Sequence, residues 1–153
     1  MSTTQAPAPT ITNAGTRPTT PHKLFVNIPV SDVQRSIKFF EALDFSFNPH
    51  FTDATATCML VGEDAYFMLL TKDRFTDFSK RPLGEPRKET GALFALSVNS
   101  REEVDAMVHK AVAAGGAHAA DPQDHGFMYG WSFYDPDGHH WEVFWMDPSA
   151  IPG

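Results

Sequence analysis

The stretch FVNIPVSD at residues 25–32 returns as LFALSVNS at residues 93–100, and this internal repeat decides the predicted fold. Each copy is a largely apolar run that predicts a strand, and each leads into a stretch with helical spacing of apolar residues. In the first helix these residues are Val33, Ile37 and Phe40. Such a repeat predicts two similar structural units related by a pseudo-twofold axis.

More strands are predicted after each helix. They are ATATCMLVG (54–62) and DAYFMLL (64–70) in the first copy, and FMYGWSFYD (127–135) and HHWEVFWM (139–146) in the second. The last two flank Asp135-Pro136-Asp137-Gly138, which has Pro and Gly at positions that favour a tight turn. Ser31 is expected to cap the first helix through its hydroxyl. The sequence therefore predicts an α+β fold.

The repeat also predicts the domain organisation. We expect one domain at residues 23–148, with a first module at about 23–80 and a second at about 91–148. The charged linker SKRPLGEPRKETG (79–91) is predicted to be a surface loop. Residues 1–22 are rich in Pro, Thr and Ala and lack a hydrophobic signal core, so we expect a disordered tail.

Composition excludes several classes of function. A formal charge of −7 argues against a nucleic-acid partner, because such proteins need clustered Lys and Arg. No apolar stretch approaches the roughly 18 residues that a membrane helix needs. The single cysteine, Cys58, excludes an internal disulfide, suits a reducing compartment and is expected to be a buried structural residue. The predicted location is the cytoplasm.

Three segments together resemble the vicinal-oxygen-chelate superfamily of glyoxalases, bleomycin-resistance proteins and dioxygenases. They are VNIPVSDVQRSIKFFEALDF (26–45), ALSVNSREEVDAMVHKAVAAGG (95–116) and GFMYGWSFYDPDGHHWEVFWMD (126–147). The resemblance implies two βαβββ modules in tandem, which form a curved mixed sheet with a concave ligand face. It also implies a homodimer and, in many members, a divalent metal such as Zn, Ni, Mn or Fe.

The metal site that the resemblance implies is largely missing. Matching the motifs places its four donor positions at Phe25, Leu69, Leu93 and Glu142, and only Glu142 can bind a metal. A divalent ion normally needs three or more protein donors. If the matching is shifted by one or two residues, Asn27 becomes the donor on the first strand. No carboxylate or imidazole lies near Leu69 or Leu93 in the sequence, so those two positions still have no donor. We therefore expect no cofactor, with a divalent metal as the alternative.

The same alignment predicts an apolar pocket with a few polar groups, which is the usual make-up of a small-molecule site. Glu142 and His140 are the candidate catalytic residues, because residues two apart on a strand share a face and can form an acid–base pair. The structural alternatives are a half-exposed, paired Glu142 and a solvated His140. The predicted ligand-binding residues are Phe25, Asn27, Phe67, Leu69, Leu93, Trp131, Phe133 and Phe144.

Three functions compete on this evidence. The first is a metal-free protein that binds a small molecule in an apolar cleft. The second is an enzyme of glyoxalase type, a lyase, isomerase or dioxygenase that uses a divalent metal held by Glu142 and a further donor. The third is an interaction module in which the sheet supports a dimer.

Overall fold

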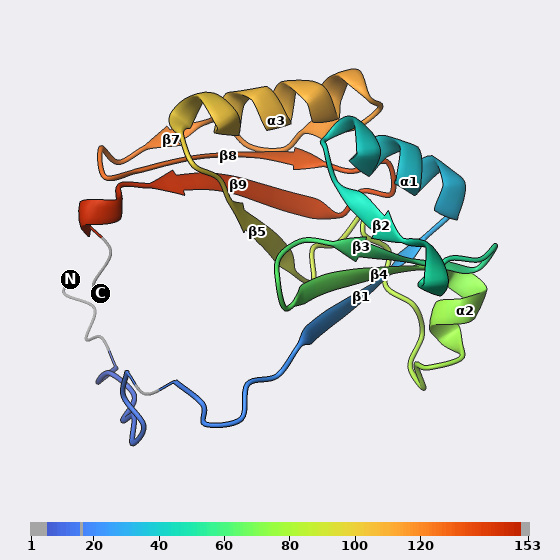
Figure 1. Cartoon of the computed structure of the whole chain (residues 1–153), viewed down its shortest axis with the longest axis horizontal. Coiled ribbons are helices and arrows are strands. Elements are labelled where there is room, and N and C mark those ends of the chain that lie inside the picture. The colour runs from blue at the N-terminus through green and yellow to red at the C-terminus, as the bar shows by residue number, and fades with distance from the viewer. Residues whose placement is uncertain (1–5, 16, 151–153) are drawn as a thin grey trace.

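Each half of the repeat folds into a strand–helix–strands module in the computed structural model, which describes residues 6–15 and 17–150; module one is βαβββ, and module two has one additional short strand. Module one contains β1 (Leu24–Val30), α1 (Val33–Ala42), β2 (Ser46–Asn48), β3 (Ala56–Leu60) and β4 (Ala65–Thr71). Module two contains β5 (Leu93–Ser97), α3 (Arg101–Ala113), β6 (Ala117–His118), β7 (Gln123–Asp124), β8 (Met128–Tyr134) and β9 (His140–Met146). The predicted α+β fold with tandem modules is confirmed (Figure 1).

Three short elements complete the chain: the 3₁₀ turn η1 (Pro49–Phe51), the helix α2 (Lys72–Thr76) and the 3₁₀ turn η2 (Pro148–Ala150). Residues 6–15 and 17–22 form no helix or strand and run away from the folded domain (Figure 1). The predicted tail also includes residues 1–5 and 16, which lie outside the described residues. No helix of the described ranges combines the length and apolarity that crossing a membrane requires.

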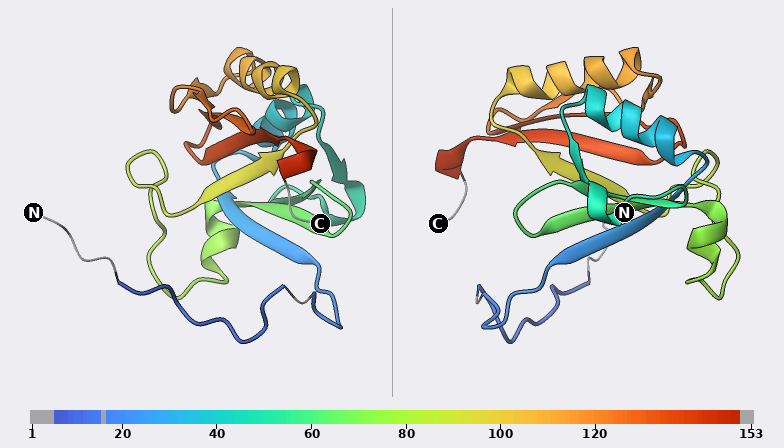
Figure 2. Two further views of the ribbon diagram at one scale, coloured as in Figure 1. Left: turned by 90° about the vertical axis from the view of Figure 1, so that its left-hand side faces the viewer. Right: turned by 45° about the vertical axis from the view of Figure 1, so that its right-hand side comes forward.

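The two modules form two sheets of the same design. Sheet A has the strand order β1-β4-β3-β2, and sheet B has the order β5-β9-β8-β6 with β7 also paired to β8. In each sheet the opening strand runs parallel to the closing strand, β1 with β4 and β5 with β9. Figure 2 shows β1 and β5 at the facing margins of the two sheets.

Strand register makes the two modules equivalent residue by residue. Asn27 pairs with Met68 across β1 and β4, as Ala95 pairs with Glu142 across β5 and β9. Paired residues project from the same face of a sheet. Met68 is therefore the counterpart of Glu142, which differs by one residue from the position that sequence matching gave.

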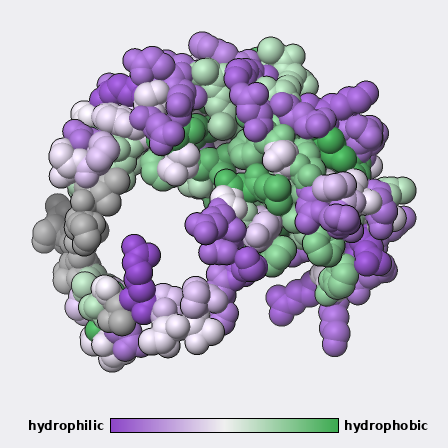
Figure 3. Space-filling view, viewed as in Figure 1, coloured by the Kyte–Doolittle hydropathy of each residue, from purple (hydrophilic) through white to green (hydrophobic). Residues whose placement is uncertain are grey.

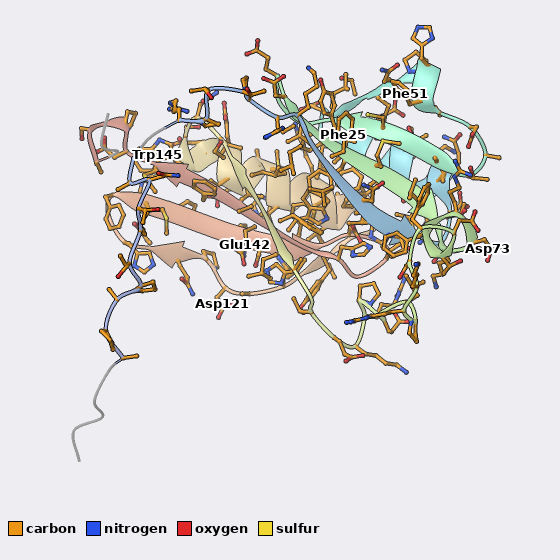
Figure 4. All side chains as sticks on the ribbon, turned by 90° about the horizontal axis from the view of Figure 1, so that it is seen from below. Phe25, Phe51, Asp73, Asp121, Glu142 and Trp145 are labelled. Atoms are coloured by element: carbon orange, nitrogen blue, oxygen red, sulfur yellow. The ribbon has the colours of Figure 1, made fainter. Side chains whose placement is uncertain are left out.

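One core joins the two modules on the faces that the helices cover. Phe67 of β4 lies 4.7 Å from Trp141 of β9 between ring centroids, and Phe39 of α1 lies 6.0 Å from Phe133 of β8. Trp141 and Phe133 have no exposed surface. The opposite face of each sheet, which we call the open face, is not covered by α1 or α3 (Figure 4), and in sheet A only the short helix α2 packs at one end of it among the described residues.

The Asp135–Gly138 turn ties module two to module one. Asp137 Oδ1 accepts hydrogen bonds from Ser31 N at 2.8 Å and Arg35 Nη2 at 2.9 Å. His139 Nε2 donates to the Pro29 carbonyl oxygen at 2.7 Å. We call these three contacts the clasp. Because they join the end of β1 to the β8–β9 turn, they fix how the two sheets meet.

The cap of α1 differs from the prediction. Asp32, not Ser31, is the N-cap, and its Oδ1 accepts a hydrogen bond from Arg35 N at 3.1 Å. Ser31 instead donates its backbone N–H to Asp137. The prediction was wrong by one position, because the helix starts at Val33 and the residue directly before it, Asp32, also has a side chain that can cap.

Candidate functional site

A cleft of about 540 Å³ lies between β1 and the beginning of β5. Its floor includes Val26, Ile28 and Phe94, together with His139 and His140 at the start of β9. Its volume is in the range of small-molecule sites, and its lining is mostly apolar with a few polar groups, as in such sites. Figure 3 shows apolar surface between the two sheets, with polar side chains around it.

The linker between the modules forms one wall of this cleft. Residues 83–86 and 89–92 all line it, although the sequence predicted only a surface loop here. The backbone of Arg87 packs directly on Gly138, where an added Cβ would lie 3.1 Å from Arg87 Cα and 2.8 Å from its Cγ. Gly138 also has a φ of +92°, so only glycine suits this contact. Arg87 Nη2 donates to the Pro136 carbonyl oxygen, which holds the linker against the turn.

His140 and Glu142 form a hydrogen-bonded pair on the open face of sheet B. His140 Nε2 lies 2.7 Å from Glu142 Oε1, and the side chains are 14% and 36% exposed. The Tyr134 ring meets the His140 ring edge-on, with 5.4 Å between centroids. Figure 4 shows Glu142 on the face of β9 away from α3. The predicted pairing of His140 with Glu142 is confirmed. The alternative, a His140 side chain exposed to solvent, is not what the structure shows, because neighbouring residues cover most of it.

Four of the predicted ligand-binding residues lie on the helix-covered faces and do not line the cleft. They are Phe67, Leu69, Trp131 and Phe133. Leu69 pairs with Ile28 and Phe133 pairs with Trp141, so register places both in the core. Trp131 packs between His109 of α3 and His118 of β6, at 5.3 Å from each ring. None of these four side chains was found in the lining of the cleft. For Leu69, and for Phe67 on the same face, the expectation rested on a matching that differs by one position from the strand register. Trp131 and Phe133 were expected at the pocket wall as aromatic side chains that could stack on a flat ligand.

The other predicted residues lie on open faces. Asn27 and His140 line the cleft itself. Phe25 stacks on Tyr66 with 4.7 Å between ring centroids. On sheet B, Leu93 pairs with His140, and Phe144 pairs with Ser97. Phe25 and Leu93 are 48% and 57% exposed. Phe25, Leu93 and Phe144 do not line the cleft.

Several lining residues were missed by sequence reasoning. Phe75 of α2, Leu83, Glu85 and Glu89 all line the cleft. The linker residues have no periodic apolar pattern that would have indicated a wall, and Phe75 lies in a helix of only five residues. The amphipathic spacing of Phe75 and Phe78 was the one available signal.

The donor set does not fit the metal that the resemblance implies. At the four matched positions, Phe25, Leu93 and Leu69 offer no donor, and the structural counterpart Met68 offers only a thioether. Glu142 has one imidazole beside it, from His140. Among residues 6–15 and 17–150, no three His, Cys, Asp or Glu side chains come together in a way that could hold an ion. Divalent ions in proteins usually have at least three protein donors.

Cys58 takes no part in the cleft. It is 2% exposed, as expected for a structural cysteine. Burial raises the pKa of the Cys58 thiol, which lowers its thiolate fraction at neutral pH. A nucleophilic role is therefore disfavoured.

Comparison with known proteins agrees with this architecture. Residues 23–143 match the family model described as Glyoxalase/Bleomycin resistance protein/Dioxygenase superfamily. A hypothetical protein, SA1046 from S. aureus, shares 29% identity with a TM-score of 0.70, over 82% of this chain and 94% of that chain.

More distant structures show the same fold. A glyoxalase/bleomycin resistance protein/dioxygenase family enzyme from Burkholderia phytofirmans PsJN shares 16% identity, with a TM-score of 0.68, over 82% of this chain and 99% of that chain. The fosfomycin resistance protein FosX from Mesorhizobium loti shares 17% identity, with a TM-score of 0.58, over 85% and 93%. The search of curated proteins returned no match. The chain belongs to the glyoxalase/bleomycin resistance protein/dioxygenase superfamily.

Proposed function

We propose that this protein binds a small, largely apolar molecule in the cleft between β1 and β5, and does so without a metal. One observation carries the proposal: a cleft of about 540 Å³ with an apolar floor lies beside open faces on which the described residues offer no metal donor set. Burial of apolar ligand surface supplies the affinity, at about 25 cal/mol per Å². The few polar groups of the cleft then orient the ligand.

The polar groups available for orientation come from both walls. Asn27 and His140 lie on the strand side, and Glu85 and Glu89 lie on the linker side. The outer edge of β1 has no strand partner among the described residues, so part of its backbone can also hydrogen-bond to a ligand. A ligand with a hydrogen-bonding group at one end can therefore bond to polar groups on both walls of the cleft.

A dye-binding measurement tests this proposal. The neutral apolar dye Nile red is titrated into protein treated with EDTA, and binding is followed by its fluorescence. Ala92 lines the cleft and is exposed, so Ala92→Trp fills the entrance with little cost to the core. Ala106, exposed on α3, supplies the control Ala106→Trp. We expect saturable binding that EDTA leaves unchanged, that Ala92→Trp abolishes and that Ala106→Trp preserves. Binding that is unaffected by Ala92→Trp would contradict the proposal.

Catalysis is a second candidate function, and the His140–Glu142 hydrogen bond is the observation that favours it. Such a pair can transfer a proton to or from a ligand that reaches His140 from the cleft. A lyase, isomerase or dioxygenase that uses a metal needs further donors, which a second subunit would have to supply. Screening substrates of those three classes with wild-type protein and Glu142→Gln tests this candidate. Turnover that Glu142→Gln abolishes, with Nile red binding intact, supports it.

The proposal includes a homodimer. Leu24 and Phe25 on β1 and Leu93 on β5 are 61%, 48% and 57% exposed at the margins of the two sheets. Exposed apolar side chains on unpaired strand edges favour association with another chain. Light scattering of wild-type protein and of Leu93→Lys tests this: we expect a dimer that the substitution weakens, and a wild-type monomer would contradict it.

A further inference from the structure

We propose that the bound molecule is an elongated amphiphile, with a cationic group in the cleft and an apolar tail in a second cavity beyond Phe75. This inference rests on the proposed function and adds the chemical class of the ligand. Two adjoining cavities, their different charge and an exposed aromatic side chain carry it.

The second cavity adjoins the cleft. It has a volume of about 430 Å³ and is lined by Asn27, Leu70, Phe75, Phe78 and Ser79. Asn27 and Phe75 also line the cleft, so these two side chains stand where the cavities meet. A ligand longer than the cleft can therefore extend past Phe75 without leaving the protein surface.

The short helix α2 carries Phe75, and the turn that follows it carries Phe78. Thr71 caps it by accepting a hydrogen bond from Arg74 N at 3.3 Å through Oγ1, so the helix begins directly where β4 ends. Phe75 then lies against the margin of β1, and Phe78 follows one turn later. Phe78 is 70% exposed, with the Arg74 guanidinium 5.4 Å from its ring. Packing within this chain leaves most of the Phe78 ring uncovered, and an apolar ligand tail would cover it.

The two cavities differ in charge, and this difference determines which end of the ligand lies in which cavity. None of the residues that line the second cavity is ionisable. Glu85 and Glu89 line the cleft, while none of its lining residues is Lys or Arg. The basic linker residues Arg87 and Lys88 line a separate hollow beside the β8–β9 turn. A cationic group therefore suits the cleft and an uncharged tail suits the second cavity.

A homologous series of probes tests this arrangement. We would measure displacement of Nile red from the full-length protein by n-alkyltrimethylammonium ions from butyl to decyl, all below micellar concentrations. The matched n-alkyl sulfates form the anionic series. The variants are Phe78→Ala with the control Phe51→Ala, and Glu89→Gln with the control Glu102→Gln. Phe51 is 60% exposed on η1 and Glu102 is exposed on α3, and neither lines a cavity described above.

We expect affinity to rise about fourfold per added methylene as the tail enters the second cavity. Phe78→Ala should weaken decyltrimethylammonium by about tenfold and leave butyltrimethylammonium within about twofold, since only the long chain reaches that ring. Glu89→Gln should weaken every ammonium probe by about three- to fivefold and no sulfate. Both control variants should behave as wild type.

Two results would overturn the inference while leaving the proposed function intact, provided that Nile red still binds. One is an affinity that does not change with chain length, or a Phe78→Ala effect that is the same at every length. The other is sulfates that bind as tightly as the ammonium ions. If Nile red itself fails to bind, the proposed function fails.

Discussion

The two modules carry similar residues on their helix-covered faces and different residues on their open faces. By register, Phe67 and Leu69 of β4 correspond to Trp141 and Val143 of β9, and all four are buried apolar side chains. On the open face, Tyr66 and Met68 correspond to His140 and Glu142. The repeat therefore retains what packing against a helix requires, while only module two carries the His–Glu pair at these positions.

The turns of the two modules differ in the same way. The β3–β4 turn of module one has Asp64 paired with Lys23 at 3.1 Å, with side chains 57% and 60% exposed. The β8–β9 turn of module two has Asp137 paired with Arg35 at 2.9 Å, and Asp137 is only 5% exposed. The first pair lies on the surface of one module, whereas the second joins the modules beside the cleft.

The largest effect should come from breaking a helix-covered face. Leu69→Glu places a carboxylate where no surface is exposed, so we expect a loss of more than about 4 kcal/mol in the free energy of unfolding. Met68→Glu, one residue earlier on the open face, should cost less than about 1.5 kcal/mol. Urea unfolding followed by circular dichroism measures both. Equal losses would show that the two faces are not distinct.

The same contrast can be made in module two with truncations. Trp141→Ala removes a fully buried indole that contacts Phe40, Phe67 and Phe94, so we expect a loss of about 3 to 5 kcal/mol. Glu142→Ala should change stability by less than about 1 kcal/mol, since Glu142 is partly exposed. Thermal unfolding would compare the pair. A Glu142→Ala loss as large as that of Trp141→Ala would mean that Glu142 has a structural role.

The turns give a third, smaller contrast. Asp137→Ala removes the acceptor for Ser31 N and Arg35 Nη2, and we expect a loss of about 2 kcal/mol. The loss is limited because Asp137 Oδ2 is buried and, within the described part of the chain, has no hydrogen-bond partner to lose. Asp64→Ala, in the exposed pair, should cost less than about 0.5 kcal/mol. Should Asp64→Ala cost as much as Asp137→Ala, the clasp would have no special role.

The smallest effect concerns a polar group on the helix-covered side of module two. Tyr129 donates its hydroxyl hydrogen to Asp105 Oδ1 at 2.6 Å, and this bond raises the pKa of Tyr129 to about 12. A raised tyrosine pKa means that the stabilisation is complete below about pH 10, the ordinary pKa, and is lost as the pH rises towards 12. Titration at 295 nm should show the Tyr129 transition moving towards about pH 10 in Asp105→Asn. An unchanged transition would mean that another group raises the pKa.

The repeat explains why the fold was predictable and the linker wall of the cleft was not. Apolar periodicity at Val33, Phe40 and Trp141 is set by local spacing, so it indicates elements and their buried faces. Which face Leu69 occupies depends on strand register, and a shift of one residue reverses the answer. The wall formed by residues 83–92 depends on the contact between Arg87 and Gly138, which are 51 positions apart. A single sequence contains no local signal for such a contact.

His140 and Glu142 were predictable for the opposite reason. Their pairing depends only on alternation along one strand, which the sequence determines once a strand is assigned. Phe75 of α2 and the linker residues Glu85 and Glu89 reach the cleft through tertiary contacts, and they were missed.

Metal analysis tests the central claim most directly, because that claim is that the open faces have lost the family's metal while an apolar cleft remains. Untagged protein would be exposed to excess zinc, nickel, manganese and iron(II), desalted and examined by elemental analysis beside Glu142→Ala. We predict that neither protein retains a stoichiometric metal ion. One metal ion per chain in the wild type, removed by Glu142→Ala, would contradict the account and show that other donors have rebuilt the site.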